Sequence, residues 1–210
     1  MPVKQTKPAP TRRRRRLSPE DRKRELLDSA VTVAAEIGLG KLVHAEVARA
    51  NNVVVATVFL YFPDAASLVR AVVEEVGSFY RKQCDEYLDG RSSAPGDLRA
   101  YGKAFVDSID THPQYAAVFL QWAAAVGNEH GIWDMFLEHI NYLERKIARR
   151  VKALPSGTKG LRTSLVDGFV QLWLGSAFVI IRLKFSGASQ KKLRQFLDQT
   201  WDLLMALGKT

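Results

Sequence analysis

The side chains best suited to binding chemistry are five consecutive arginines near the N-terminus, Arg12, Arg13, Arg14, Arg15 and Arg16. Guanidinium groups bind phosphate, so a run of this length suits the backbone of a nucleic acid or a narrow minor groove of DNA. A solubilising tail or a membrane-surface tail has the same composition. DNA is favoured here because the run directly precedes a candidate DNA-binding unit.

No arrangement of residues points to catalysis. The sequence has no nucleophile–base pair, glycine-rich phosphate loop or paired-cysteine motif, so we expect no enzyme activity. His130, Asp134 and Glu138 are spaced four apart with His139 beside them, and could hold a metal on one helix face. Such patterns on a charged surface are usually solvated. We therefore expect no metal and no cofactor, apart from an unidentified small apolar ligand.

Two short helices joined by a tight corner are predicted between Val43 and Phe62, running from about Val43 to Ala50 and onward from near Val54. The corner is Asn51-Asn52-Val53, and asparagine tolerates positive φ best after glycine. Pro63 ends the second helix. This pattern is typical of a helix-turn-helix, which offers its second helix to the major groove of DNA, but a plain structural corner shares it.

The second helix places four apolar residues on one side: Val55, Val58, Phe59 and Phe62. Thr57 and Tyr61 are the preferred DNA contacts, since a threonine meets a phosphate or a thymine methyl and a tyrosine reaches a phosphate. His44 could approach a phosphate or simply lie at the surface. The full set of candidate DNA-binding residues is Arg12, Arg13, Arg14, Arg15, Arg16, His44, Asn51, Val55, Thr57 and Tyr61.

The surrounding sequence predicts an all-α fold of about nine helices. The first starts at Ser18-Pro19-Glu20-Asp21, where Ser18 can cap it, and carries Leu27, Ala30, Val31, Ala34 and Ile37 on one face. Asp64 caps a long helix to about Leu88, with Leu68, Val72, Val73, Val76 and Tyr80 as its inner stripe. Later helices are expected near 97–110, 114–126, 129–154, 160–185 and 188–207. The expected domains are a disordered basic arm (1–16), a DNA-binding domain (17–63) and a ligand-binding and dimerisation domain (64–210).

The last two helices predict a dimer interface. The penultimate helix is apolar on all sides, so it must be covered on all sides, and part of the cover is expected from a second copy. Gly168 and Gly175 would allow close helix approach. The expected interface residues are Leu165, Phe169, Trp173, Phe196, Trp201 and Leu204. The alternative is that this helix pair is internal core.

Charge and cysteine content limit the class of protein. The 210 residues carry a formal net charge of +9, of which seven positive charges precede Glu20, so the rest of the chain is nearly neutral. A single cysteine, Cys84, excludes an internal disulfide and favours a reducing compartment. No apolar stretch follows the basic run, so no secretory signal is expected. The low-charge run from Leu165 to Ile181 is expected to be too short to span a bilayer. We expect a cytoplasmic protein.

The stretches RKRELLDSAVTVAAEIG and VFLYFPDAASLVRAVVEEV, with the helix-turn-helix between them, resemble the N-terminal domain of TetR-family transcriptional regulators. VVVATVFLYFP and RRRRLSPEDRK are most similar to the LuxR/HapR branch, the quorum-sensing master regulators. VFLQWAAAV and the tract from Trp133 to Lys146 resemble that branch's ligand-domain helices. The resemblance implies a three-helix DNA-binding head on a ligand-binding and dimerising body. It also implies repression relieved by a small molecule, with gene activation in this branch.

The chain departs from the family pattern in its head. Asn51-Asn52 stands where the family has a small residue and then glycine, or glutamine in this branch. Val54 stands where a serine or threonine usually caps the recognition helix. Valine cannot accept the free amide hydrogen bonds, which lowers helix stability by about 1 kcal/mol. Leu60 stands where this branch has a polar residue on the side that faces the DNA groove. After the YFP motif the family commonly has a basic residue that meets a phosphate, and Asp64-Ala65-Ala66 contains none. Three outcomes stay open: the head reads an unusual sequence, binding depends on the arginine arm, or the head no longer binds an operator.

The body is rich in aromatic residues, most of them expected in the core. Pockets between helices combine aromatic walls with a few inward polar groups, for which His139, Asn141, Gln83 and Gln171 are candidates. The resemblance implies a pocket lined from Tyr80–Cys84, Phe119–Trp122, Phe136–Asn141 and Gln171–Phe178. The candidate ligand-binding residues are Tyr80, Gln83, Cys84, Phe119, Trp122, Phe136, His139, Asn141, Gln171 and Phe178.

The preferred function is a homodimeric, ligand-responsive regulator that binds a palindromic operator in double-stranded DNA, with no membrane partner. The alternative is a helical dimer that binds a ligand or a partner protein and has only non-specific affinity for DNA. Salt dependence and sequence dependence of DNA binding separate the two.

Overall fold

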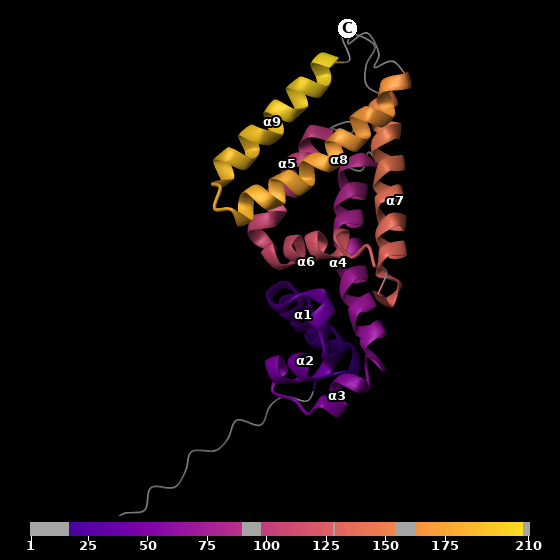
Figure 1. Ribbon diagram of the computed structural model, residues 1–210, viewed down its shortest axis with the longest axis vertical. Coiled ribbons are helices and arrows are strands. Elements are labelled where there is room, and N and C mark those ends of the chain that lie inside the picture. Colours follow the sequence, from indigo (N-terminus) through magenta and orange to yellow (C-terminus); the bar gives the residue numbers. More distant parts are fainter. Residues whose placement is uncertain (1–16, 90–97, 128, 154–162, 208–210) are drawn as a thin grey trace, which may run out of the picture.

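The computed structural model describes residues 17–89, 98–127, 129–153 and 163–207, and within these residues it contains nine α-helices, two short 3-10 helices and no strand (Figure 1). The all-α prediction is confirmed. The α-helices are α1 (Pro19–Ile37), α2 (His44–Asn51), α3 (Val55–Phe59), α4 (Ala65–Leu88), α5 (Leu98–Thr111), α6 (Pro113–Ala123), α7 (Ile132–Lys152), α8 (Thr163–Phe185) and α9 (Gln190–Leu207). The 3-10 helices are η1 (Leu39–Lys41) and η2 (Glu129–Gly131).

Helices α1, α2 and α3 form a small bundle, called the head below, at the base of the molecule (Figure 1). Helix α1 begins as the sequence predicts, because the Ser18 hydroxyl accepts a hydrogen bond of 3.0 Å from the Asp21 amide. It ends at Gly38, whose φ of 98° suits glycine. The buried face of α1 contains Leu26 rather than Leu27, which is only partly buried.

Helix α4 connects the head to the remaining helices, called the body. Its N-terminus is a capping box: the Ser67 amide donates to the Asp64 carboxylate at 2.6 Å, and the Asp64 amide donates to the Ser67 hydroxyl at 3.1 Å. The predicted inner stripe, Leu68, Val72, Val73, Val76 and Tyr80, is fully buried. With 24 residues the helix is about 36 Å long, so it runs from α3 into the middle of the body (Figure 1).

Helix α7 starts three residues later than expected. His130 has a φ of 62° and Gly131 a φ of 69°, so the chain turns before the helix begins at Ile132. His130 is therefore off the helix that carries Asp134 and Glu138, and the one-face arrangement considered for a metal does not form. Among the described residues, no group of three or more histidine, cysteine or acidic side chains could hold a metal ion.

Helix α8 is more apolar than a surface helix needs to be. By length and composition, Leu165–Phe185 is long and apolar enough to cross a membrane, with a mean hydropathy of 1.5, so the expectation that this run is too short is wrong. Buried core helices of soluble proteins can have the same length and apolar composition. One side of α8 packs against α7 and α9, and only 39% of the apolar window is buried. Leu165, Leu172 and Phe185 of this helix remain exposed in one copy of the chain.

Candidate nucleic-acid interface and internal pocket

The corner between α2 and α3 has the geometry that the sequence predicts. Asn52 adopts the left-handed conformation, with φ 51° and ψ 51°, and its amide donates to the Arg49 carbonyl at 3.2 Å. Helix α3 is shorter than expected, since it ends at Phe59. Of its expected inner residues only Val58 and Phe62 are buried, while Val55 and Phe59 are partly exposed. The recognition helix is therefore held by few apolar contacts.

His44 is not a surface residue, so its candidate role as a phosphate contact is wrong. The side chain is 5% exposed, its Nε2 lies 2.7 Å from the Phe62 carbonyl oxygen, and its ring stacks on Phe59 with centroids 3.9 Å apart. These two contacts join the start of α2 to the last residue of α3 and to the segment that follows it. His44 therefore positions the recognition helix.

Asn51 is also a positioning residue and not the base-reading residue that its place in the corner suggested. Its side chain is buried. The amide donates to the Val47 carbonyl at 2.8 Å, and its Oδ1 accepts from the Ser29 hydroxyl at 3.0 Å. The corner is tied to α1 in this way, and the Asn51 side chain is turned away from any DNA that α3 would meet.

Thr57 and Tyr61, the preferred DNA contacts, lie together on a surface groove between α3 and the start of α1. The groove is lined by Leu17, Ser18, Pro19, Asp21, Arg22, Thr57, Leu60 and Tyr61. Thr57 in α3 and Tyr61 just after it are both half-buried, and Leu60 between them is 81% exposed. The groove borders the point where the five arginines join α1. Arg12, Arg13, Arg14, Arg15 and Arg16 themselves lie outside the described residues.

The head without its arm is not basic. Residues 17–63 contain five lysine or arginine residues and six acidic residues, a formal balance of −1. Three of the five, Arg22, Arg24 and Arg49, form ion pairs within their own helices, with Glu25, Asp28 and Glu46. Helix α3 carries no charge. Attraction to phosphate must therefore come mainly from the arginine arm.

The start of α3 lacks a side-chain cap. Val54 occupies the capping position with extended dihedrals, φ −74° and ψ 147°, and is 71% exposed. Serine fits this conformation and can accept the free amides of the first turn. We expect Val54→Ser to raise the free energy of unfolding by about 0.5–1 kcal/mol in urea denaturation. Val54→Ala, which cannot cap, is the control, and equal effects of the two substitutions would contradict this explanation.

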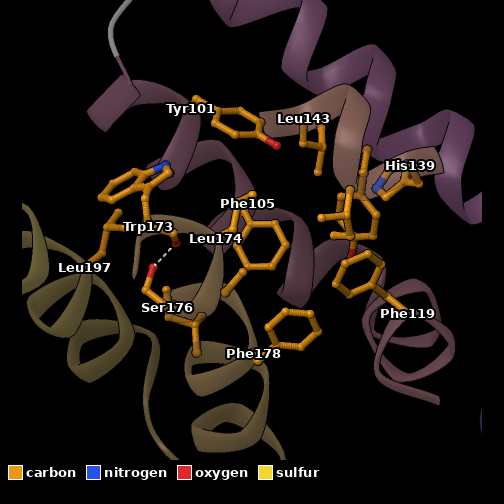
Figure 2. A pocket seen from close by; sticks show the side chains of 15 residues that line it. Tyr101, Phe105, Phe119, His139, Leu143, Trp173, Leu174, Ser176, Phe178 and Leu197 are labelled. Atoms are coloured by element: carbon orange, nitrogen blue, oxygen red, sulfur yellow. Dashed lines mark hydrogen bonds between the residues drawn. The ribbon is translucent and has the colours of Figure 1, made fainter. Parts of the chain in front are cut away.

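A second candidate site lies inside the body, where side chains from α4 to α9 surround a cavity of about 40 Å³ (Figure 2). Four predicted ligand-binding residues line it: Tyr80, Phe119, His139 and Phe178. Six do not: Gln83, Cys84, Trp122, Phe136, Asn141 and Gln171. Sequence reasoning missed Tyr101, Phe105, Leu143 and Leu174. It placed Trp173 at the dimer interface, although this ring lines the cavity.

The six misplaced residues have other roles or positions. Trp122 is buried against α7 and donates its indole N–H to the Ile132 carbonyl at 2.6 Å. Gln83 donates to the Ala104 carbonyl at 3.2 Å, and Gln171 donates to Glu144 at 2.6 Å on the surface. Asn141 is exposed. Phe136 is buried, stacked on Trp133. Burial raises the pKa of the Cys84 thiol to about 12, so it stays protonated and unreactive.

The outer faces of α8 and α9 form a third feature, an apolar groove with a volume of about 690 Å³, called the α8/α9 face below. It is lined by Gln171, Leu172, Gly175, Ser176, Val179, Phe196, Thr200, Leu203, Leu204 and Ala206. A side chain added at Gly168 or Gly175 would meet nothing within 4 Å. Of the expected interface residues, Phe196 and Leu204 lie on this face and Leu165 is exposed along α8. Trp201 is partly buried between helices.

Phe169 and Trp173 correct the interface prediction. They are 3% and 4% exposed and pack inward, where Trp201 meets both of their rings at centroid distances of 6.2 Å and 5.6 Å. The residues that point outward instead are Leu172 and Leu203. The outward face of α8 follows the spacing Leu165, Gly168, Leu172, Gly175 and Val179, which is the a/d repeat of packed helices.

Comparison with known proteins supports the same reading of the fold. No family model matches the chain. It is 31% identical over 126 residues to the HTH-type transcriptional regulator LuxR of Vibrio harveyi, a match that spans 60% of this chain and 60% of that protein.

Solved structures share the fold over most of their length. A TetR transcription regulator from Haloarcula marismortui ATCC 43049 has a TM-score of 0.68 at 12% identity, covering 89% of this chain and 98% of that one. The fatty acid degradation regulator FadR from Bacillus halodurans has a TM-score of 0.67 at 16% identity, covering 91% and 97%. The resemblance to TetR-family transcriptional regulators is thus confirmed. The relative and both of these solved structures are named as regulators.

Proposed function

We propose that this chain, which has the fold of TetR-family transcriptional regulators, is a homodimeric DNA-binding regulator whose operator affinity changes when a small molecule binds in the body. The observation that carries the proposal is the placement of Thr57 and Tyr61. They lie on one exposed groove of an α2–α3 corner, directly beside the helix that continues from the arginine arm. The division into a head (17–63) and a body (64–210) belongs to the proposal.

A dimer built on the α8/α9 face would present two copies of α3. A helix-turn-helix dimer binds two half-sites about 34–36 Å apart, so its operator is a palindrome. In each half-site the arm would supply phosphate contacts, and Thr57 and Tyr61 would supply the polar contacts that α3 has available. The regulator would act in the cytoplasm. A quorum-sensing role, implied by the resemblance to the LuxR/HapR branch, stays a prediction.

Helix α6 is the element that would pass a signal from the cavity to the head. It carries Phe119 in the cavity wall, and two residues later Gln121 reaches the head. The Gln121 side chain accepts from the Leu39 amide at 2.8 Å and donates to the Ala35 carbonyl at 3.3 Å. A shift of α6 that makes room for a ligand would therefore pull on the junction of α1 and η1. Such a ligand would act by shifting the population of two head arrangements.

A substitution at Gln121 should loosen this connection. In Gln121→Leu both hydrogen bonds are lost and the Leu39 amide loses its partner, so we expect the free energy of unfolding to fall by about 1–2 kcal/mol. The Leu39 amide should also exchange with solvent faster than in the wild type, as measured by NMR. Gln114→Leu, two turns earlier in the same helix, is the control. Unchanged exchange at Leu39 would show that Gln121 does not hold the head.

The experiment that tests the proposal selects binding sites from a randomised duplex pool at near-physiological salt and sequences them. The intact chain should enrich one palindrome and prefer it to random DNA by at least about 1000-fold. A variant lacking residues 1–16 should bind the same palindrome more weakly. Its salt dependence should be shallower by up to roughly 6 in the log–log slope for each subunit, since five arginines and two lysines are removed. No enrichment by either protein would overturn the proposal.

One observation favours a second candidate, a helical dimer with only non-specific DNA affinity. The head has a formal balance of −1, and its recognition helix exposes Val54 and Leu60 where polar residues would contact DNA. Such a protein would bind DNA of any sequence weakly through its arginine arm, and its affinity would fall as the salt concentration rises. In the selection experiment it would show binding without enrichment.

A further inference from the structure

The cavity in the body has an aromatic wall and no charged lining residue. Six rings contribute to the wall, those of Tyr80, Tyr101, Phe105, Phe119, Trp173 and Phe178. In Figure 2 the labelled rings surround one space, with His139 near one end and Trp173 near the other. Among the residues that the structure describes, no lysine, arginine, aspartate or glutamate lines the cavity. An ionic ligand would lose its hydration there without meeting an opposite charge, so it would be bound poorly.

Most polar groups around this cavity are already satisfied by the protein. The Ser176 hydroxyl donates to the Trp173 carbonyl at 2.6 Å. The Tyr80 hydroxyl is hydrogen-bonded to Ser108, and the Tyr101 hydroxyl to Cys84. These groups gain little from a ligand.

His139 is different, because it is 1% exposed and neither ring nitrogen has a hydrogen-bond partner in the described structure. It lines the cavity between the rings of Phe119 and Trp122, at centroid distances of 5.9 Å and 5.5 Å. Burial, with a smaller effect of Arg81, lowers its pKa to about 4, so at neutral pH it is an uncharged imidazole. It then has one N–H donor and one nitrogen acceptor. An unpaired buried polar group costs free energy, which a ligand with a matching group would recover.

We infer that the cavity takes an uncharged aromatic molecule with a single neutral hydrogen-bonding group, such as a hydroxyl, which pairs with the His139 imidazole. This inference rests on the proposed function, since it names the class of effector that a ligand-responsive regulator of this sequence would bind.

The cavity must widen to accept such a molecule. Its 40 Å³ holds no aromatic ring until a side chain moves. Phe119 and Phe178 stack on one another at 5.5 Å, and Phe178 is partly exposed, so separating this pair opens the cavity toward solvent. Since Phe119 belongs to α6, the same movement would act on Gln121 and hence on the head.

The test uses three para-substituted toluenes on the full chain at pH 7.5. They are 4-methylphenol, p-xylene, in which a methyl of similar size replaces the hydroxyl, and 4-methylbenzoate, which carries a larger, anionic carboxylate. Binding is measured by calorimetry and by the fluorescence of Trp173 and the other tryptophans. We expect 4-methylphenol to bind about tenfold more tightly than p-xylene, the effect of one hydrogen bond to a buried group, and 4-methylbenzoate to bind weakest.

In His139→Leu the preference for 4-methylphenol over p-xylene should disappear while p-xylene still binds. A second measurement needs no variant. The imidazole resonances of His139 in the wild type should shift with 4-methylphenol and much less with p-xylene. Equal affinities for 4-methylphenol and p-xylene in the wild type, tighter binding of 4-methylbenzoate, or no binding of any probe would each overturn the inference.

Selection of operator DNA on the same preparation separates this inference from the proposed function. If a palindrome is enriched and no probe binds, the proposed ligand class is wrong and the proposal of a DNA-binding regulator is supported. If the probes bind in the expected order and no sequence is enriched, the cavity assignment stands and the regulator is wrong.

Discussion

Leu172→Arg should convert the proposed dimer to a monomer and weaken operator binding by roughly 10²–10⁴-fold, the range by which two linked binding sites exceed one. Leu172 lies at the middle of the α8/α9 face and is 57% exposed in one copy of the chain. An arginine there remains solvated in the monomer, so the fold should survive. In a dimer the same arginine would be buried against its own symmetry copy, where two like charges without partners are strongly unfavourable.

Sedimentation equilibrium and fluorescence anisotropy on the selected operator measure the two effects. Leu137→Arg is the matched control, because Leu137 is 43% exposed on α7, is not part of the α8/α9 face and gains the same charge. Leu172→Met, which keeps an apolar side chain, should remain dimeric. A Leu172→Arg protein that stays dimeric would place the interface on another surface.

The orientation of α8 shows what the sequence could not decide. The helix is apolar on all sides, so hydrophobic periodicity gives no preferred face, and Phe169 and Trp173 were assigned outward when they point inward. Packing decides the orientation, since two bulky rings fill the space that α9 and α5 leave. A useful signal lay in Gly168 and Gly175, which are small where a facing helix would have to come close.

Elements with a clear amphipathic pattern were predicted well. The stripe of α4 is buried as expected, because it repeats at 3.6 residues between a capping aspartate and a polar loop. His139 was found for the same reason, since it takes a position in the buried repeat of α7 beside Phe136 and Leu143. Asn141 lies two residues further, about 200° around the helix, and is therefore exposed.

Roles that depend on contacts between distant segments were not predictable. Nothing local to His44 indicates that the Phe62 carbonyl will accept its hydrogen bond, and nothing local to Gln121 indicates its two bonds to the head. The rings of Trp122 and Phe119 have the same sequence signature, although one is core and the other lines the cavity. Only the packing of α6 between α4 and α7 separates them.

The unpaired imidazole of His139 should make the protein sensitive to acid. Its pKa is lowered to about 4 in the folded chain and is near 6.5 in an unfolded chain, so the unfolded state binds the proton more readily. Above pH 6.5 neither state is protonated and the group has no pH effect. As pH falls from 6.5 to 4, the unfolded state gains the proton, and the free energy of unfolding should drop by roughly 2–3 kcal/mol in total. The loss ends below the folded pKa.

His139→Leu should remove this part of the pH dependence. It should also raise the free energy of unfolding at pH 7.5 by about 1–2 kcal/mol, because an apolar side chain of similar size replaces a buried polar group without partners. Urea denaturation of both proteins at pH 4.5, 5.5, 6.5 and 7.5 measures the difference. Arg81 on α4, which also lowers the pKa of His139, is present in both proteins, so its own contribution cancels in the comparison. Parallel curves for the two proteins would contradict the predicted effect of His139 on the pH dependence, and equal stability at pH 7.5 would mean that the ring nitrogens are paired in solution.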